Sequence, residues 1–522
     1  MSGVRLEFPY INSRNLQLIM KKSRKLSRRQ FIGSAATASL AFTIVPRNVL
    51  GGAGFVAPSE QLTLGYIGCG TQGMREMTGL IANPKIRIVA VCDPNKMSTD
   101  YIDWSPNGIR DGIRKALEDP TWGDKITGIP GGRDIGQDFV EKYYAKDKTK
   151  KYKGCASYAD FRELLEKEKD VDTLKIMTPD HLHATISIAA MKKGKNVVIH
   201  KPIANRIYES RLTIDTARSS GAGTHLLAWS HRPGNHLVKK WISEGAIGNL
   251  KEIHNWSYRP VWPQWTSNPT DTPPVPKDFN WDLWLGPVPD RPYHPNYTHC
   301  VFRGWYDFGG GSIADMGHYS LWPMFLTLGI NTAPLSAEAY ATTNRTIVDQ
   351  VSRNIVNDVA FPYSCIVRFK FPKQETLPAF DLFWYDGGMK PHTPEELEID
   401  GKDLPQEGML FVGDKGKILG GFRNEDPVLI PESKMNSYLN GQPYPKEDPN
   451  RSDDNWIDAF REKKQSPGSF LLAGPVSETI NLGAIALRTR KKIVYDQSKM
   501  EITNVPEANK YLRREYRKGW EL

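Results

Sequence analysis

Four short segments of the sequence carry residues whose types and spacing could do chemistry: GCGTQG at 68–73, TPDHLHA at 178–184, HKPIA at 200–204 and GGGSIADMGHYS at 309–320. In the last segment, Asp315, His318 and Tyr319 fall within two turns of a possible helix. A carboxylate, an imidazole and a phenol can all exchange protons with a bound substrate. Whether they do so here depends on what the rest of the chain binds.

The glycine-rich segment has the features of a dinucleotide-binding loop. Gly68, Gly70 and Gly73 follow an apolar strand at 61–68 and open a helix, and Asp93 ends the next strand 20 residues later. The glycines allow a tight turn, close approach of a pyrophosphate and helix–strand packing, while the acid can bind the ribose 2′-hydroxyl. Because a 2′-phosphate would face the charge of Asp93, NAD is favoured over NADP. The alternative is a glycine-rich turn without a cofactor, with Asp93 as a helix cap. The residues expected to bind the cofactor here are Gly68, Cys69, Gly70, Thr71, Gln72, Gly73 and Asp93.

Two further motifs follow strands expected at 171–178 and 196–200. Ligands of open parallel sheets bind at the carboxyl ends of the strands, and a lysine before proline is held extended, so Lys201 can point into the crevice. Alternatively, Thr178 or Asp180 caps the next helix and Lys201 is a solvated surface residue. The further residues expected at the cofactor site are Thr178, Pro179, His181, His183, Lys201 and Pro202.

The elements that must position these residues form an α/β fold. Strands and helices alternate through residues 61–230, which predicts an N-terminal Rossmann domain with a doubly wound parallel sheet. Helices are expected at 107–118, 134–145, 158–168, 181–194 and 206–221, further strands at 86–93 and 224–230, and an insertion at about 94–150. Alternating stretches such as 364–371, 379–386 and 408–421 then predict a second α/β domain over 231–522, with a large open mixed or antiparallel sheet.

Composition excludes some classes of protein. The net charge of the 522 residues is +10, but nine lysines and arginines against two glutamates fall in residues 1–60, so the rest is close to neutral. A nucleic-acid partner is therefore not expected. The five cysteines are scattered without CxxC spacing, so neither a disulfide framework nor a metal site is predicted.

Residues 1–60 are interpreted as an export address and a linker. Ser27, Arg28, Arg29, Phe31 and Ile32 match the twin-arginine pattern S-R-R-x-F-[LI], and an apolar run of about 13 residues follows at 33–45. That run is too short to span a bilayer. We therefore expect the twin-arginine export machinery as a partner and a periplasmic location; an ordinary secretory signal is the alternative.

The motifs together resemble the Gfo/Idh/MocA oxidoreductases, of which glucose-fructose oxidoreductase is a member. The resemblance covers roughly residues 61–520 and rests on GYIGCGTQG, VAVCDPN, TPDHLHA, HKPIA and GGGSIADMGHYS. It implies a Rossmann domain followed by an α/β domain with a large open sheet that often serves oligomerisation, so a homo-oligomer is expected. It also implies NAD(P) and oxidation or reduction at a sugar or cyclitol hydroxyl.

The resemblance also implies roles for single residues. Lys201 matches the family's E-K-P lysine, near the nicotinamide and the reacting hydroxyl, but His200 replaces the usual Glu. The D-x-G-x-H pattern falls on Asp315, Gly317 and Tyr319, with Tyr in place of His, as in glucose-fructose oxidoreductase. Asp315 and Tyr319 share a helical face. We expect Lys201, Asp315 and Tyr319 to form an acid/base set in which the ammonium stabilises tyrosinate, with His318 at the substrate side in a catalytic or a contacting role.

These expectations combine into a function. The chain is predicted to be an exported NAD-dependent oxidoreductase acting on a sugar or glycoside hydroxyl, with a tightly bound cofactor that is recycled in place. Aromatic side chains before the last motif could stack on sugar rings; these are Trp256, Trp262, Trp265, Trp281, Trp284 and Trp305. One alternative is an NAD-dependent glycosidase that works by transient oxidation, elimination and re-reduction. Another is a sugar-binding protein that holds NAD without turnover.

Overall fold

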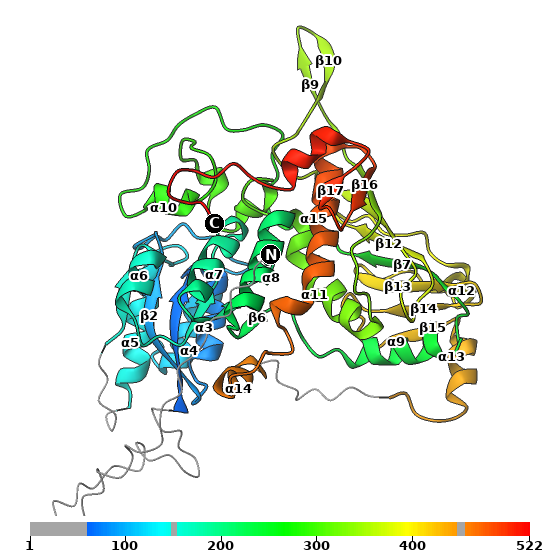
Figure 1. Ribbon diagram of the computed structural model, residues 1–522, viewed down its shortest axis with the longest axis horizontal. Helices are drawn as coiled ribbons and strands as arrows, with labels where there is room; N and C mark the ends of the chain where they lie inside the picture. Colours follow the sequence, from blue (N-terminus) through cyan, green and yellow to red (C-terminus); the bar gives the residue numbers. More distant parts are fainter. Residues whose placement is uncertain (1–59, 148–153, 446–454) are drawn as a thin grey trace, which may run out of the picture.

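The computed structural model describes residues 60–147, 154–445 and 455–522 (Figure 1). The predicted twin-arginine segment lies in residues 1–59, outside the described part. Within the described ranges, no helix combines the length and apolar character that a membrane crossing requires.

The first sheet has six parallel strands in the order β3-β2-β1-β4-β5-β6. Strand order reverses beside β1, so the carboxyl ends of β1 and β4 border the crevice where ligands of such sheets bind. The central strands β4 and β5 are buried along almost their whole length, as expected for a sheet covered by helices on both faces. The strands are β1 (Leu62–Ile67), β2 (Ile86–Cys92), β3 (Ala156–Tyr158), β4 (Thr173–Ile176), β5 (Asn196–Ile199) and β6 (Thr224–Leu226).

The helices of this part pack in two groups, α3 with α4 and α5, and α7 with α6 and α8. Their bounds lie close to the ranges expected from the sequence. They are α3 (Thr71–Leu80), α4 (Gly108–Leu117), α5 (Arg133–Ala145), α6 (Phe161–Lys167), α7 (His183–Lys192) and α8 (Ile207–Ser220). Two differences matter. The short edge strand β3 was not expected, and the strand expected at 224–230 ends at Leu226, which leaves the following residues free to form a loop.

The second sheet has nine strands in the order β15-β14-β13-β7-β12-β11-β8-β16-β17 and is mixed, because β12 runs parallel to β7 while the other pairs are antiparallel. The predicted α/β fold class, with a Rossmann sheet and a large mixed sheet, is therefore confirmed. The strands are β7 (Leu250–Trp256), β8 (Ser336–Ala341), β11 (Cys365–Phe371), β12 (Phe380–Tyr385), β13 (Gly408–Gly413), β14 (Lys417–Gly420), β15 (Val428–Ile430), β16 (Ile493–Asp496) and β17 (Glu501–Ile502).

Helix α11 (Gly311–Leu328) connects the two sheets. It begins at Gly311, the third glycine of the GGGSIADMGHYS segment, and packs against α9 and α15, while α15 packs on α8, β8 and β11. One continuous core of buried side chains runs from the first sheet through α11 to the second. The helices outside the Rossmann sheet are α9 (Pro233–Ser243), α10 (Trp281–Leu285), α11, α12 (Glu395–Ile399), α13 (Glu432–Leu439), α14 (Asn455–Arg461) and α15 (Gly474–Thr489).

A two-stranded hairpin of β9 (Asn344–Val348) and β10 (Val351–Ile355) projects from the rest of the molecule (Figure 1). Its apolar side chains Ile347, Val348 and Val351 are exposed.

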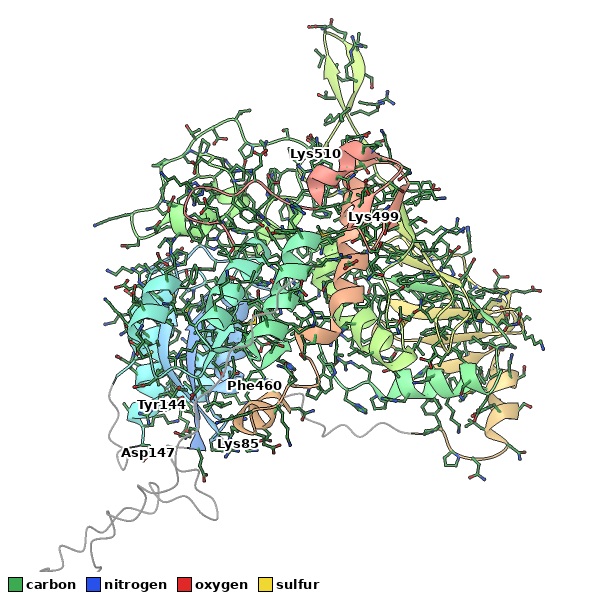
Figure 2. The ribbon with its side chains drawn as sticks, viewed as in Figure 1. Lys85, Tyr144, Asp147, Phe460, Lys499 and Lys510 are labelled. Carbon is green, nitrogen blue, oxygen red and sulfur yellow. The ribbon has the colours of Figure 1, made fainter. Side chains whose placement is uncertain are left out.

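Chain segments from the C-terminal part return to the Rossmann sheet. Helix α14 packs on β1, and Asp458 forms an ion pair with Lys85 at a distance of 2.7 Å, at the end of the sheet where β2 begins. Figure 2 shows Lys85 and Phe460 in this region. The ring of Phe460 fills the space beside Gly223, so that an added Cβ there would lie only 2.7 Å from it. The two sheets are therefore tied together by more than α11.

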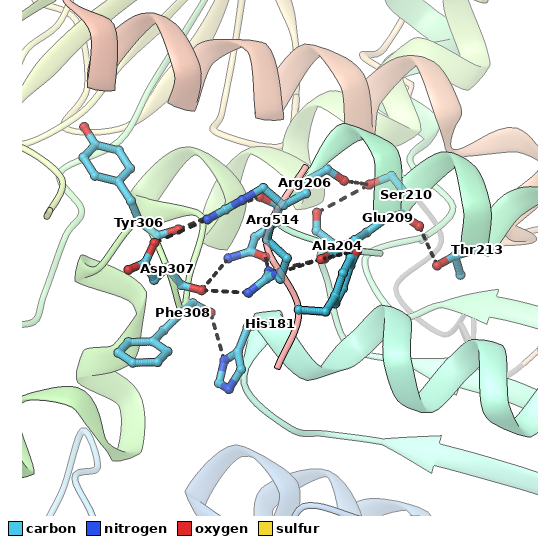
Figure 3. Close-up of polar contacts among 12 residues, drawn as sticks. His181, Ala204, Arg206, Glu209, Ser210, Thr213, Tyr306, Asp307, Phe308 and Arg514 are labelled. Carbon is cyan, nitrogen blue, oxygen red and sulfur yellow. Dashed lines mark hydrogen bonds and ion pairs between the residues drawn. The ribbon is translucent and has the colours of Figure 1, made fainter. Parts of the chain in front are cut away.

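The last residues of the chain form a second tie (Figure 3). The guanidinium of Arg514 pairs with the carboxylate of Glu209 on α8, and their side chains are only 4% and 2% exposed. Arg514 also donates to Asn205 and to the backbone carbonyl of Asp307. The amide of Asn205 in turn lies 3.4 Å from the carbonyls of Asp307 and Gly309. These contacts fasten the loop after β5 to the loop that leads into α11.

Removing this buried cation should destabilise the protein strongly. Arg514→Ala leaves the carboxylate of Glu209 buried without its partner, so the free energy of unfolding should fall by roughly 3–5 kcal/mol. Urea or thermal denaturation followed by circular dichroism measures the change. Arg513→Ala is the matched control, since Arg513 is exposed and its guanidinium lies over the ring of Tyr208. Equal effects of the two substitutions would contradict the assignment.

Candidate functional site

The glycine loop at the end of β1 leaves room for a ligand and hydrogen-bond donors to hold it. Gly68 has a φ of +96°, and a Cβ there would lie 2.6 Å from the carbonyl oxygen of Met177. A Cβ on Gly70 would come within 3.1 Å of the ring of Tyr101. Within the described residues, no side chain caps the first N–H groups of α3. Such a helix terminus suits a pyrophosphate.

Asp93 lies at the wall of the same cavity, directly after β2. Its two carboxylate oxygens accept the backbone N–H groups of Cys69 at 2.7 Å and Asn95 at 2.8 Å. Burial raises the pKa of this carboxyl, while the two N–H donors act in the opposite direction. The aspartate thus joins the glycine loop to the end of β2. The Cys69 thiol is buried against Gly136, so this residue contributes its backbone and not its side chain.

Three of the residues expected after β4 and β5 line the cavity, namely Thr178, Pro179 and Lys201. The hydroxyl of Thr178 is buried and has no hydrogen-bond partner among the described residues. A buried hydroxyl without a partner costs free energy unless a ligand supplies one, so Thr178 fits a ligand-contacting position.

His181, His183 and Pro202 do not line the cavity, contrary to expectation. Nε2 of His181 lies 2.8 Å from the carbonyl oxygen of Trp284, and Nδ1 of His183 lies 2.6 Å from that of Pro202. Burial lowers the pKa of His181 to about 3 and that of His183 to about 4, so both rings are neutral. These histidines join backbone segments behind the cavity wall. The spacing of residues could not predict that His181 and His183 point away from the cavity, because their side-chain directions depend on the backbone conformation of the turn that carries them.

The cavity has a volume of about 290 Å³ and lies between the carboxyl edge of the first sheet, the start of α11 and the loops before it. Its lining therefore comes from segments far apart in the sequence. Those used below are Gly68, Gly70, Thr71, Gln72, Gly73, Arg75, Asp93, Tyr101, Trp104, Thr178, Pro179, His200, Lys201, Arg259, Trp262, Trp284, Arg303, Asp315, Tyr319 and Arg423.

A cluster of charges lies where β5 meets α11. The ammonium of Lys201, only 2% exposed, pairs with a carboxylate oxygen of Asp315. The same oxygen accepts Nε of Arg303 at 3.1 Å. Burial lowers the pKa of Lys201, and Asp315 counters that shift. Although burial acts in the opposite direction, Lys201 and Arg303 together hold the pKa of Asp315 down at about 2.

Tyr319 stands beside this cluster, and its hydroxyl lies 2.8 Å from Nε2 of His200. The ammonium of Lys201 lies 5.2 Å from the centroid of the tyrosine ring, and the guanidinium of Arg423 lies 4.9 Å from it. Burial and the charge of Asp315 raise the pKa of Tyr319, and burial lowers that of His200. The expectation that Lys201 stabilises a tyrosinate was therefore wrong: the phenol is neutral and hydrogen-bonded to a neutral imidazole.

His318 points away from the cavity, so its expected position at the substrate side was wrong. It is fully buried, and its Nδ1 lies 2.9 Å from the carbonyl oxygen of Ala314, one helical turn earlier. Burial lowers its pKa to about 3. Its other ring nitrogen has no hydrogen-bond partner among the described residues. In α11 the 315/319 face lines the cavity, and the flank that carries 318 packs into the core.

Several cavity residues had not been singled out from the sequence. Arg303 belongs to a short 3-10 helix at His299–Gly304, and Asp180 accepts the N–H of Gly310 at 3.1 Å behind the cluster. Burial raises the pKa of Asp180 to about 6 against the charges of Arg303 and Lys201. Tyr101 and Trp104 come from the insertion after β2. Asp180 belongs to the TPDHLHA motif, but Arg303, Tyr101 and Trp104 belong to no motif, so only the fold brings these three residues to the cavity.

Of the six tryptophans proposed as sugar platforms, Trp262 and Trp284 line the cavity. Trp265, Trp281 and Trp305 pack in the aromatic cluster that also holds Trp284, through the stacked pairs Trp265–Trp305 and Trp281–Trp284, whose ring centroids lie 5.1 and 5.0 Å apart. Trp256 lies in a different hydrophobic cluster, on the second sheet. The described residues contain no group of three or more His, Cys, Asp or Glu side chains suited to a metal ion.

Two family models match the chain. The model described as oxidoreductase family, NAD-binding Rossmann fold, matches residues 138–226. The model described as oxidoreductase family, C-terminal alpha/beta domain, matches residues 236–365 and 385–522.

Individual known proteins are also similar. Levoglucosan dehydrogenase of Pseudarthrobacter phenanthrenivorans is 35% identical over 114 residues, 20% of this chain and 29% of the relative. A glycosyl hydrolase family 109 protein of Saccharopolyspora erythraea is 23% identical over 192 residues, 37% of this chain and 34% of the relative. The chain thus spans about a third of the length of these two curated relatives. The crystal structure of the WlbA dehydrogenase from Bordetella pertussis, in complex with NADH and UDP-GlcNAcA, has a TM-score of 0.48 at 13% identity, covering 84% of this chain and 99% of that one.

The charge of Asp93 should decide which cofactor is bound. Native protein, denatured and examined by mass spectrometry, should release NAD and not NADP. In Asp93→Asn the repulsion of a 2′-phosphate is gone while one acceptor oxygen remains, so the affinity for NADP relative to NAD should rise at least about tenfold. Calorimetric titration measures both affinities. Asp111→Asn, on the exposed face of α4, is the control; release of mainly NADP by the native protein would refute the argument.

Proposed function

The chain belongs to the Gfo/Idh/MocA oxidoreductase family, and we propose that it is an NAD-dependent oxidoreductase acting on a hydroxyl of a sugar or glycoside. One observation carries the proposal. The glycine loop and Asp93, which suit a dinucleotide, share a single cavity with the Lys201–Asp315–Arg303 cluster. A bound dinucleotide and a substrate hydroxyl can therefore meet at groups able to exchange a proton.

The residues present fit NAD. The open N-terminus of α3 provides donors for the pyrophosphate, Asp93 provides an acceptor for the ribose, and the Thr178 hydroxyl lacks a partner that a ribose or amide could supply. When bound, NAD would accept a hydride from the carbon that carries the reacting hydroxyl. The chain must then take up the hydroxyl proton.

Lys201 is proposed to take up that proton. Its burial lowers the pKa of the amine, which raises the fraction of neutral base available near neutral pH. Asp315 holds the lysine at the end of β5, in the same cavity as the glycine loop, and Arg303 in turn holds Asp315. Tyr319 is proposed to position the substrate through its hydroxyl, which His200 orients.

The cavity wall suits a carbohydrate. The indole N–H of Trp262 and Nε of Arg259 are buried and have no hydrogen-bond partner among the described residues, so each can donate to a sugar hydroxyl. The faces of Trp262 and Trp284 offer an apolar surface to a sugar ring. The name of the relative levoglucosan dehydrogenase also points to a sugar substrate.

We further propose that the protein is exported by the twin-arginine pathway and acts as a homo-oligomer. The pathway carries folded proteins, so NAD can be bound before export. Outside the membrane no pool of free NAD is expected, so the cofactor would be recycled on the protein. Reduction of a second sugar would achieve this.

A redox-neutral glycosidase is the second candidate, favoured by the similarity to a glycosyl hydrolase family 109 protein. Oxidation at the sugar C3 would acidify the C2 proton, allow elimination of the glycosidic group and water addition, and end with re-reduction. The same residues would serve. The products distinguish the candidates: a ketosugar indicates the oxidoreductase, and a free sugar without net redox change indicates the glycosidase.

Kinetics can test the role of Lys201. Lys201→Ala should lower the turnover rate by roughly 10²–10⁴ while NAD is retained. Because the carboxylate of Asp315 raises the pKa of Lys201, Asp315→Asn should move the rising limb of kcat/KM towards lower pH. Asp403→Asn, on the exposed surface, is the control. An unchanged midpoint in Asp315→Asn, or near-normal turnover in Lys201→Ala, would assign the proton transfer to another group.

Export should depend on the arginine pair. With Arg28 and Arg29 both replaced by lysine, the protein should remain in the cytoplasm, because the pathway recognises the paired guanidinium groups. Cell fractionation followed by immunodetection measures this. Arg24→Lys makes the same chemical change just before the motif and should leave export intact. Normal export of the double variant would point to a general secretory route.

A further inference from the structure

Some of the positively charged side chains that line the cavity have no carboxylate partner among the described residues. The guanidinium of Arg75 pairs with Asp103, and Lys201 and Arg303 share Asp315. The remaining cavity arginines, Arg259 and Arg423, form no ion pair within the described part of the chain. Both guanidinium groups lie over aromatic rings: Arg259 lies over Trp104 and Tyr258, and Arg423 lies over Tyr319.

Arg423 also borders a second chamber of about 220 Å³. The two cavities share Tyr319 and Arg423, so the ring and the guanidinium stand between them. The rest of the chamber is formed mainly by the loop after β6, where the structure ends the strand at Leu226. Its lining is Glu76, His225, Leu227, Ala228, Trp229, Ser230, Arg232, Tyr319 and Arg423.

The chamber has groups that suit an anion. Arg232 and Arg423 line it, and its one carboxylate, that of Glu76, already pairs with Lys175 at 3.1 Å. Ser230 is 7% exposed, and its hydroxyl is buried without a hydrogen-bond partner among the described residues. Burial lowers the pKa of His225 to about 3, so the imidazole adds no charge. The Arg423 guanidinium, which forms no ion pair among the described residues, and the Ser230 hydroxyl are donors that a carboxylate or sulfate can accept.

The cofactor does not account for these groups. The phosphates of a dinucleotide belong at the open N-terminus of α3, next to Gly70. Arg423 instead lies over Tyr319, beside the Lys201–Asp315 pair where the reacting hydroxyl belongs. An oxidised nicotinamide would add a further positive charge there. The excess is therefore on the substrate side of the site.

We propose that the substrate is an anionic saccharide whose carboxylate or sulfate ester enters the second chamber and binds Arg423, with the Ser230 hydroxyl as a further donor. The ring that is oxidised stays in the first cavity, next to Lys201 and Tyr319. This inference rests on the proposed sugar oxidoreductase, whose substrate class it narrows.

Binding measurements on the full-length protein with its retained cofactor test the proposal. The probes are methyl glycosides of glucose, galactose and mannose, each compared with the matching methyl uronide and 6-O-sulfate. At least one anionic probe should bind at least about tenfold more tightly than its neutral counterpart. Raising the salt concentration from about 0.05 to about 0.5 M should reduce that preference. The uronide and sulfate series distinguish the two sources of charge.

Substitutions test whether Arg423 is the source of the preference for the anionic probe. Arg423→Gln should weaken binding of the anionic probe by roughly tenfold to a hundredfold, and by much more than it weakens binding of the neutral probe. Arg423→Lys should restore part of the loss, because it retains the charge without the planar fork. Arg353→Gln makes the same charge change on the exposed hairpin strand β10 and is the matched control.

The outcomes separate this inference from the proposed function. If anionic sugars bind through Arg423 but NAD is never reduced, the inference stands and the oxidoreductase proposal fails. If the protein oxidises neutral sugars and shows no preference for their anionic forms, the inference is wrong but the oxidoreductase proposal stands. The same holds if Arg423→Gln and Arg353→Gln bind the anionic probe equally well. Loss of NAD from Arg423→Gln would assign the chamber to the cofactor, and a panel in which no anionic probe binds better than its neutral form would also overturn the inference.

Discussion

Two buried cations share one carboxylate at the centre of this molecule, and the architecture around the cavity follows from that constraint. Without Asp315, the ammonium of Lys201 and the guanidinium of Arg303 would be largely buried with no opposite charge in contact, which is strongly unfavourable. The lysine follows β5, the arginine belongs to the 3-10 helix at His299–Gly304 before α11, and the aspartate lies on α11. The N-terminal part of α11 must therefore be held so close to the edge of the parallel sheet that Asp315 and Lys201 are within hydrogen-bond distance.

Hydrogen bonds and ion pairs outside the cavity help to hold α11 close to Lys201. Arg514 and Asn205 join the loop after β5 to the loop before α11, close to both members of the Lys201–Asp315 pair. Asp307, two residues before the glycines, lies near several guanidinium groups, and Arg291 and Arg206 hold its pKa at about 2 although burial acts in the opposite direction. The glycines then let the chain turn into the helix: Gly311 has a φ of +67°, and a Cβ there would lie 2.5 Å from the ring of Phe361. Positioning of the charged cluster is thus distributed over residues remote in sequence.

This distribution explains what the sequence could and could not predict. The fold class and most of the strands and helices of the first sheet could be predicted from the sequence. Strands that are buried on both faces are apolar throughout, and the alternation of strands with helices gives a regular local pattern. The glycine loop and Asp93 were readable for the same reason, since their spacing is set within one strand–helix–strand unit. The directions of His181, His183 and His318 were not, because a histidine that contacts a backbone carbonyl looks the same in sequence as one that faces a cavity. Arg303 and Arg423 were missed because only long-range packing brings them to Tyr319 and Asp315.

The replacement of the family's usual Glu by His200 has an electrostatic consequence for the whole site. A glutamate directly before Lys201 would add a second carboxylate near the ammonium and would raise the pKa of the lysine. Burial keeps the imidazole of His200 neutral, so it orients the Tyr319 hydroxyl without contributing charge. Asp315, which also pairs with Arg303, is then the main opposite charge for Lys201, with a smaller contribution from Asp180, and desolvation is the largest influence on the pKa of the lysine. A neutral residue at position 200 thus keeps the pKa of Lys201 lower than a glutamate would, and it also leaves the cavity more positive. Arg423, which lies over Tyr319 and forms no ion pair among the described residues, increases that positive potential.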